Sequence, residues 1–80
     1  MRLPRDLSGA ELIKRLKRLG YEITRQSGSH IRPTTQEYGE HHVTIPNHDP
    51  LRIGTLAAIL DAVAAHHGLG RDEFVNRLME

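Results

Sequence analysis

The chain has 80 residues, with 11 Lys or Arg, 10 Asp or Glu, 6 His and no Cys or Trp. A chain of this length buries only about 60% of its unfolded surface, so it forms one domain and cannot support two cores. The lack of cysteine excludes disulfides and thiolate metal sites, and no apolar run is long enough to span a membrane. We expect a single domain over 1–80, with a core at about 8–78, a flexible segment at 1–7 and a cytoplasmic location.

The net charge of +1 conceals an uneven distribution. Residues 1–32 hold eight Lys or Arg against three Asp or Glu, whereas residues 33–80 hold three against seven. Such segregation is expected of a protein that binds a polyanion. A solvated basic helix face is the alternative interpretation.

The first expected element is a helix over 9–19. Ser8 and Glu11 have the spacing of a capping box, and Gly20 is suited to the left-handed residue that ends a helix. One stripe of the helix is apolar: Leu12, Ile13, Leu16 and Leu19. The rest of its circumference is basic: Lys14, Arg15, Lys17 and Arg18.

Three strands follow. Residues 21–26 and 41–45 alternate apolar and polar side chains, and a strand starting at His30 is expected to weaken at Pro33, which cannot donate to a ladder. Residues 34–40 are polar and predict a hairpin loop. The alternation predicts one covered sheet face, formed by Tyr21, Ile23, Ile31, Val43 and Ile45. It predicts an open face formed by Glu22, Thr24, His30, Arg32, His42 and Thr44.

Two more helices complete the chain. Thr55 is the expected N-cap of the first, whose apolar residues are Leu56, Ile59, Leu60 and Val63 and whose end is marked by His67 and Gly68. A short helix over 71–79 should bury Phe74, Val75 and Leu78. The predicted class is therefore α+β, in the order αβββα plus a terminal helix, with a three-stranded antiparallel sheet covered on one face by helices.

Residues 25–30, Arg-Gln-Ser-Gly-Ser-His, form a polar turn between the first two strands. Gly28 supplies the conformational freedom that a tight reversal needs, so His30 starts its strand at a fixed position. A histidine placed in this way can transfer protons near neutral pH. An ordinary hairpin turn with an exposed histidine is the alternative.

Six histidines raise the question of a metal site, which their spacing argues against. His41 and His42 should point to opposite faces of a strand, and His66 and His67 diverge by about 100° on a helix. Two ligands on one helical face need a spacing of three or four residues. We therefore expect no metal and no other cofactor.

Histidine beside arginine suits RNA cleavage. RNA carries its own nucleophile, the 2′-hydroxyl, so a protein needs only a proton-transfer group and cationic stabilisation of the transition state. DNA lacks that hydroxyl. His42, if it lies across from His30 on the next strand, is a candidate second proton-transfer group, with an ordinary surface histidine as the alternative.

Several short motifs together resemble the HicA (YcfA-like) family of bacterial toxins. They are Leu12-Ile13-Lys14, Leu19-Gly20-Tyr21, the 25–30 turn, Val43-Thr44-Ile45-Pro46 and Gly54-Thr55-Leu56-Ala57-Ala58-Ile59-Leu60. The resemblance covers roughly residues 8–78. The chain departs from the family pattern at two places. Its second helix is longer, because the segment 62–67 precedes the glycine that ends it, and Gly70 stands where Ser or Thr commonly caps the third helix.

The resemblance implies a fold similar to a double-stranded-RNA-binding domain and an mRNA interferase whose catalytic histidine is His30. Its implied partners are mRNA and a HicB-type antitoxin, with operator DNA contacted only through the toxin–antitoxin complex and no membrane. We expect Arg25, Ser29 and Arg32 near the scissile phosphate, and Lys14, Lys17 and Arg18 as further RNA contacts. A non-catalytic RNA-binding module and a degenerate toxin that serves only as a regulatory partner are the alternatives.

Overall fold

The structure is a computed structural model that describes residues 6–80. Its elements in chain order are α1 (Gly9–Lys17), β1 (Glu22–Ser27), β2 (His30–Thr35), β3 (His41–His42), β4 (Ile45–Pro46), α2 (Ile53–His66) and α3 (Arg71–Met79). β2 pairs antiparallel with β1 on one side and with β3 and β4 on the other. The predicted α+β order is confirmed, with the third strand divided in two, and it is compatible with a double-stranded-RNA-binding domain.

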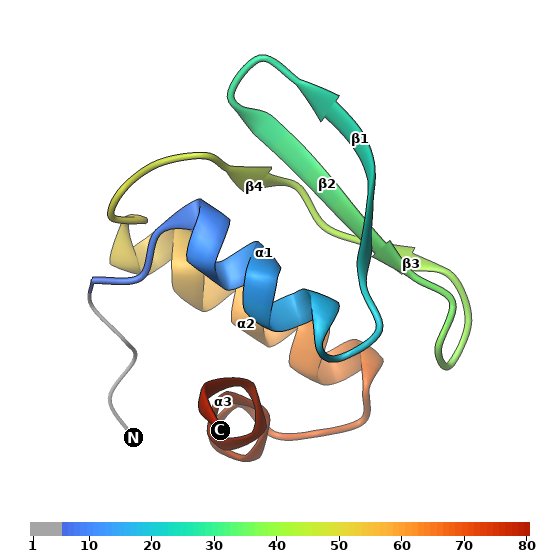
Figure 1. The fold of residues 1–80 in the computed structure, drawn as a ribbon. Coiled ribbons are helices and arrows are strands. Elements are labelled where there is room, and N and C mark those ends of the chain that lie inside the picture. Colours follow the sequence, from blue (N-terminus) through green and yellow to red (C-terminus); the bar gives the residue numbers. More distant parts are fainter. Residues whose placement is uncertain (1–5) are drawn as a thin grey trace.

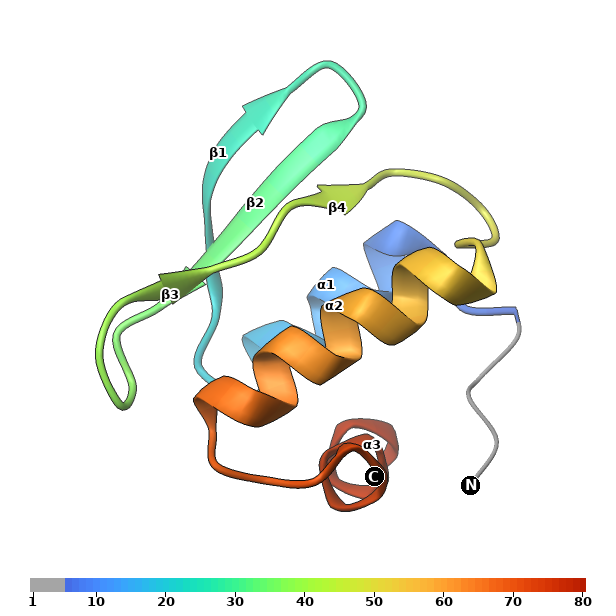
Figure 2. The same ribbon diagram turned by 180° about the vertical axis from the view of Figure 1, so that it is seen from behind.

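The domain has two main layers. α1 and α2 lie side by side against one face of the sheet, and α3 crosses beneath them (Figures 1 and 2). The β1–β2 hairpin extends beyond the helices and carries its turn at its free end, far from α3 (Figure 1). The sheet therefore has one covered and one open face, and the hairpin turn is the most projecting part of the described chain.

α1 begins and ends as the sequence predicts. The Ser8 hydroxyl accepts the Glu11 backbone N–H at 3.0 Å. At the other end Gly20 has φ +98°, and the N–H groups of Tyr21 and Gly20 donate to the carbonyls of Leu16 and Lys17. These are the two hydrogen bonds of a Schellman motif, so the glycine turns the chain directly into β1.

The second and third helices confirm the predicted core residues but not the predicted N-cap. α2 begins at Ile53, with Arg52 in the N-cap position, so Thr55 lies inside the helix. Leu51 is buried and fixes the chain just before this point, which lets the helix start three residues earlier than predicted. The remaining apolar predictions hold, because Leu56, Ile59, Leu60, Val63, Phe74, Val75 and Leu78 are all buried.

Two sheet predictions are wrong. β2 does not weaken at Pro33 but continues to Thr35, and the Pro33 carbonyl accepts the Val43 N–H at 3.3 Å. The donor that proline lacks falls between β3 and β4, which explains why the third strand is divided there. Ile23 pairs with the buried Pro33 and so lies on the expected face of the sheet, but the prediction that its side chain is covered is wrong. It is 41% exposed because β1 is an edge strand with every residue exposed.

The predicted flexible segment 1–7 lies mostly outside the described residues. Its last residue, Leu7, belongs to the core with 6% of its surface exposed. The Leu7 carbonyl accepts the Leu51 N–H at 2.8 Å, which ties the chain before α1 to the chain before α2. The core thus begins at least one residue earlier than the expected 8–78.

Gly9, at the start of α1, is a point of close backbone approach between the helix layer and β4. Its N–H donates to the His48 carbonyl at 2.8 Å, and a Cβ built on Gly9 would overlap the Pro46 carbonyl oxygen. Pro46 belongs to β4, which pairs with His30. The glycine therefore permits a backbone contact that sets how β4 lies against α1.

Three histidines from two elements meet at the C-terminal end of α2. The rings of His41 and His66 are stacked at 4.3 Å, and the buried Tyr21 hydroxyl lies 3.3 Å from His41 Nδ1 and 3.2 Å from His67 Nε2. His66 Nε2 donates to the carbonyls of Glu37 and Gly39 at 2.9 and 3.1 Å. This histidine cluster joins β3, the β2–β3 loop and α2.

The close approach at Gly9 generates a stability prediction. Gly9→Ala should destabilise the domain by about 1–3 kcal/mol, because the added methyl group must push the Pro46 backbone away. Gly54→Ala is the matched control, since Gly54 lies in α2 with nothing near its Cβ position and alanine there should stabilise by about 0.5–1 kcal/mol. Urea unfolding measures both, and equal stability changes in the two variants would contradict the steric account.

The histidine cluster generates a prediction about pH. Burial, and secondly the neighbouring imidazoles, lower the pKa of His41 and His67, although Glu37 acts weakly in the opposite sense on His67. The folded state favours the neutral imidazole rings over the charged ones. Their contribution to stability is therefore fully present above the ordinary pKa of 6.5 and is lost as pH falls through the lowered pKa values. The urea concentration at the unfolding midpoint should therefore decrease as the pH is lowered from about 7.5 to about 5.

Variants separate this effect from general acid sensitivity. His41→Gln and His67→Gln keep a polar partner for the Tyr21 hydroxyl but cannot titrate, so each should flatten the pH dependence. His48→Gln is the control, because that side chain is exposed and outside the cluster. A pH profile unchanged by the first two variants would show that the cluster is not responsible.

Candidate active site

The turn between β1 and β2 consists of only two residues, Gly28 and Ser29, because the ladder closes with the pair Ser27 and His30. Gly28 has φ +59° and occupies the first turn position, the arrangement of a type II′ hairpin. A side chain there would strain the backbone. The predicted role of Gly28 in fixing the start of the second strand is thus confirmed.

His30 is held from both sides. It pairs with Ser27 of β1 and with Pro46 of β4. Asn47, just after β4, donates its N–H to the Ser29 carbonyl at 2.6 Å. The backbone beneath His30 is therefore anchored by two neighbouring segments, while its imidazole is exposed to solvent.

An irregularity in β1 decides where Arg25 lies. The pairing of Ile23 with Pro33 is followed by the pairing of Arg25 with Arg32, so Thr24 is an extra residue in β1. The Thr24 hydroxyl donates to the Arg32 carbonyl at 3.1 Å and lies 2.6 Å from the Thr34 hydroxyl. Such a bulge reverses the side-chain alternation beyond it. Without it Arg25 would pair with Ile31 and face the covered side.

The bulge places both arginines on the same face as His30. A shallow depression of about 210 Å³ opens there, lined by Arg25, Ser27, His30, Ile31, Arg32 and Thr44. Along β2, His30 and Arg32 are two residues and about 7 Å apart on one face. Arg25, His30 and Arg32, three of the residues predicted from the sequence, are thus brought together.

The two guanidinium groups are close together on the open face. Arg25 and Arg32 are directly opposite, which places their Cβ atoms about 4.5–5.5 Å apart, and like charges in that relation destabilise a sheet. Within residues 6–80 neither arginine forms an ion pair with a carboxylate. An anion bound between them would relieve the repulsion, and the bidentate geometry of arginine suits a phosphate.

His42 is on the open face but not across from His30. It pairs with Thr34, whereas the residue opposite His30 is Pro46. Thr34 is four residues from His30, or about 13 Å along the strand. The expectation that His42 sits opposite His30 is therefore wrong, because the third strand is displaced along β2 relative to that register.

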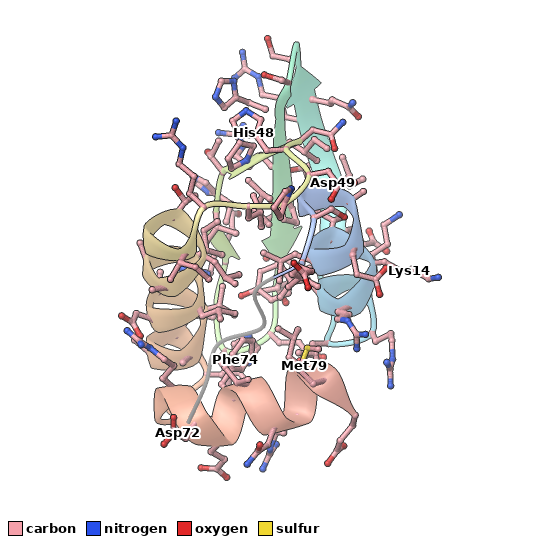
Figure 3. All side chains as sticks on the ribbon, turned by 90° about the vertical axis from the view of Figure 1, so that its left-hand side faces the viewer. Lys14, His48, Asp49, Asp72, Phe74 and Met79 are labelled. Atoms are coloured by element: carbon pink, nitrogen blue, oxygen red, sulfur yellow. The ribbon has the colours of Figure 1, made fainter. Side chains whose placement is uncertain are left out.

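The three predicted helix cations are also separated from His30. Lys14, Lys17 and Arg18 are exposed residues of α1 and the turn after it, and Lys14 points outward from the helix layer (Figure 3). None of them lines the depression around His30. Arg15 has a different role, because it donates to the Leu78 carbonyl and pairs with Glu11, joining α1 to α3.

Sequence reasoning missed two features of this end of the sheet. Thr24 carries no sequence signal that it is an extra residue, because its hydrogen bonds go to β2 and depend on the pairing itself. Ser27 was taken only as part of the turn, but it lines the depression opposite His30. Ser29 contributes its carbonyl to the anchoring of the turn.

Two further properties bear on function. Within residues 6–80 no group of three or more His, Asp or Glu side chains is arranged to hold a metal ion. No single helix in the same range is long and apolar enough to cross a membrane, and α2 with α3 meets that test only as a pair bent by 99°. The inward-facing apolar side chains of both helices, including Leu60 and Phe74, are buried in the core, whereas Ile53 and Met79 are 40% and 39% exposed.

A comparison with protein families gives a match to this chain. The family model described as "HicA toxin of bacterial toxin-antitoxin" matches residues 9–64, from the start of α1 to the last turns of α2. The matched range includes the hairpin turn, both arginines and His30, and leaves out α3. No curated protein and no solved structure matches the chain. Because the match covers more than two thirds of the sequence, the chain belongs to the HicA toxin family of bacterial toxin–antitoxin systems.

Proposed function

We propose that this toxin is a metal-independent endoribonuclease that cleaves mRNA in the cytoplasm, with His30 as its acid–base residue. The observation that carries the proposal is the pair of uncompensated arginines beside an exposed, well-anchored histidine. Arg25 and Arg32 bind the scissile phosphate, and the Ser29 turn contacts the adjoining backbone. Lys14, Lys17 and Arg18 are too far round the molecule to touch the same phosphate and contact the RNA elsewhere.

The chemistry follows from what RNA itself supplies. The 2′-hydroxyl oxygen attacks the adjacent phosphorus, the bond to the 5′-oxygen breaks, and a cyclic phosphate and a 5′-hydroxyl result. His30 takes the proton from the attacking hydroxyl or supplies one to the leaving oxygen. The two guanidinium groups stabilise the charge that develops on the phosphorane oxygens.

Toxin–antitoxin membership implies an antitoxin in general. We propose a HicB-type protein that covers the depression and presents carboxylates to Arg25 and Arg32, so that antitoxin and RNA exclude each other. Operator DNA would then be contacted only through the complex of the two proteins.

A second candidate function is a non-catalytic RNA-binding module. It is favoured by the position of His42, which pairs with Thr34 and is therefore not the second proton-transfer group opposite His30. Turnover separates the two functions, because a binding module protects RNA and an endoribonuclease fragments it.

The catalytic assignment predicts the effect of removing the imidazole. His30→Ala should lower RNA cleavage by at least about 100-fold, the usual contribution of a general acid or base. It should change the free energy of unfolding by no more than about 0.5 kcal/mol, because the side chain is exposed. His42→Ala is the matched control on the same face and should cleave normally. Cleavage by His30→Ala at the wild-type rate would end the assignment.

The arginine pair predicts a salt dependence. Arg25→Gln and Arg32→Gln should each lower the slope of log affinity against log salt by about 0.7, the value for one phosphate contact to single-stranded nucleic acid. Each should also slow the cleavage of saturating RNA, because the lost charge acts in the transition state. Lys14→Gln should lower the affinity for RNA without slowing the cleavage of RNA that is already bound. If all three variants behaved alike, the depression would not be the phosphate site.

A further inference from the structure

The α1–β1, β2–β3 and α2–α3 connections gather at the end of the domain opposite the hairpin turn (Figures 1 and 2). Residues in and beside these connections line a second hollow. Its volume is about 450 Å³. Three kinds of side chain line it: the rings of Tyr38, His67 and Phe74, the cations Lys17, Arg18 and Arg77, and the carboxylate of Glu37. Neither the predicted motifs nor the proposed cleavage uses the rings or the carboxylate.

Tyr38 is the unusual member of this group. It is 78% exposed, and its φ of +59° is a left-handed conformation that bulky residues rarely adopt. Its ring stands edge-on to His67 at 5.5 Å, and His67 in turn lies 6.0 Å from the Phe74 ring. Glycine or asparagine would suit this backbone better, so neither burial nor backbone preference accounts for an aromatic residue here.

Glu37 presents a carboxylate beside that ring. Its backbone is fixed by two hydrogen bonds, from its N–H to Thr35 Oγ1 at 3.1 Å and from His66 Nε2 to its carbonyl at 2.9 Å. The carboxylate rests over Gly20, where an added Cβ would come within 2.9 Å of its Cδ. It forms no ion pair within residues 6–80. An acceptor with both oxygens free is thus held next to an exposed aromatic face.

The cations form the basic side of the hollow. Lys17 and Arg18 suit the negative end of the α1 dipole, which alone would explain their presence. Arg77 belongs to α3 and has only an exposed partner, Glu73, at 3.4 Å. The dipole does not explain why cations from two helices adjoin a free carboxylate and a stack of rings. That combination matches the face of a base, the hydrogen-bonding edge of the same base, and a phosphate.

We propose that this hollow binds one guanine nucleotide of the RNA, a specificity that rests on the proposed ribonuclease function. The base stacks on Tyr38, as bases do on aromatic side chains in single-stranded RNA recognition. Its N1–H and N2–H groups donate to the two Glu37 oxygens, and Lys17 and Arg18 bind its phosphate.

The carboxylate selects guanine by the order of donors on the base. Guanine has two adjacent donors on its Watson–Crick edge. Adenine, cytosine and uracil each place an acceptor beside their donor, which a carboxylate repels. Five residues of β2, or about 17 Å, separate His30 from Thr35 next to the hollow. The selected guanine therefore lies several nucleotides from the bond that is cut.

Titration of the isotope-labelled full chain with GMP, AMP, CMP and UMP, followed by NMR, tests this assignment. GMP should shift the amide signals of residues 17–20, 37–38 and 67–69, and should bind at least tenfold more tightly than the other three, a difference of about 1.4 kcal/mol. Equal binding of all four nucleotides, or GMP shifts confined to other residues, would overturn it.

Variants at Tyr38 and Glu37 identify the contacts. Tyr38→Gly suits the left-handed backbone, so it should fold with an unchanged or higher Tm and bind GMP about 5- to 100-fold more weakly. Tyr38→Phe keeps the stacking ring and should bind like the wild type. Glu37→Gln should remove the preference for GMP over AMP. GMP affinity unaffected by Tyr38→Gly in a folded protein would contradict the stacking role.

RNA oligonucleotides separate this inference from the proposed function. An oligonucleotide with one guanine should compete with GMP for the hollow, and a guanine-free one should not. Competition by neither would overturn the assignment to RNA, leaving a free nucleotide as the ligand, and equal competition by both would overturn the selectivity for guanine. GMP binding by a chain that never cuts RNA would support the guanine site in the hollow and refute the proposed ribonuclease function. RNA cleavage that does not depend on guanine in the substrate, together with no GMP binding, would refute only the guanine site.

Discussion

The extra residue in β1 is the constraint on which the candidate site depends. Side chains alternate along a strand, so a regular β1 would send Arg25 to the face that packs on the helices. Insertion of Thr24 moves Arg25 to the open face, opposite Arg32 and beside His30. Two hydrogen bonds of the Thr24 hydroxyl hold the irregularity in place. The domain thereby keeps two repelling cations together, at a cost that a bound phosphate would offset.

The helix layer controls the same site from behind. Gly9 lets α1 approach the Pro46 backbone, Pro46 pairs with His30, and Asn47 bonds to the turn at Ser29. These backbone contacts connect the first turn of α1 to His30, and none of them depends on a side chain of the open face. It explains how a projecting hairpin with an exposed edge strand can hold an imidazole in a defined place.

Much of the fold could be predicted because its signals are local. Ser8 and Gly20 bound α1 through contacts within four or five residues, and Gly28 needs only its own backbone to make the turn. Arg25 and Arg32 were expected near one phosphate because arginines flank His30 in the sequence, and the pairing places them opposite each other. Strand alternation alone would have placed Arg25 on the covered face. His42 was misplaced because register depends on pairing between strands. The cluster of His41, His66 and His67 was missed because its contacts to Tyr21 span 20 and 46 residues of sequence.

In the proposed mechanism the hairpin site cuts RNA by using the 2′-hydroxyl of the RNA and no metal ion. The most direct measurement compares the purified chain, in the presence of EDTA, on an RNA oligonucleotide and on the same oligonucleotide with a 2′-deoxy nucleotide at the cleaved position. We expect cleavage of the first oligonucleotide, with a 5′-hydroxyl on the downstream product, and no cleavage of the second at the modified position. Cleavage of both oligonucleotides at the same position, or activity that EDTA abolishes and one added divalent metal restores, would contradict it.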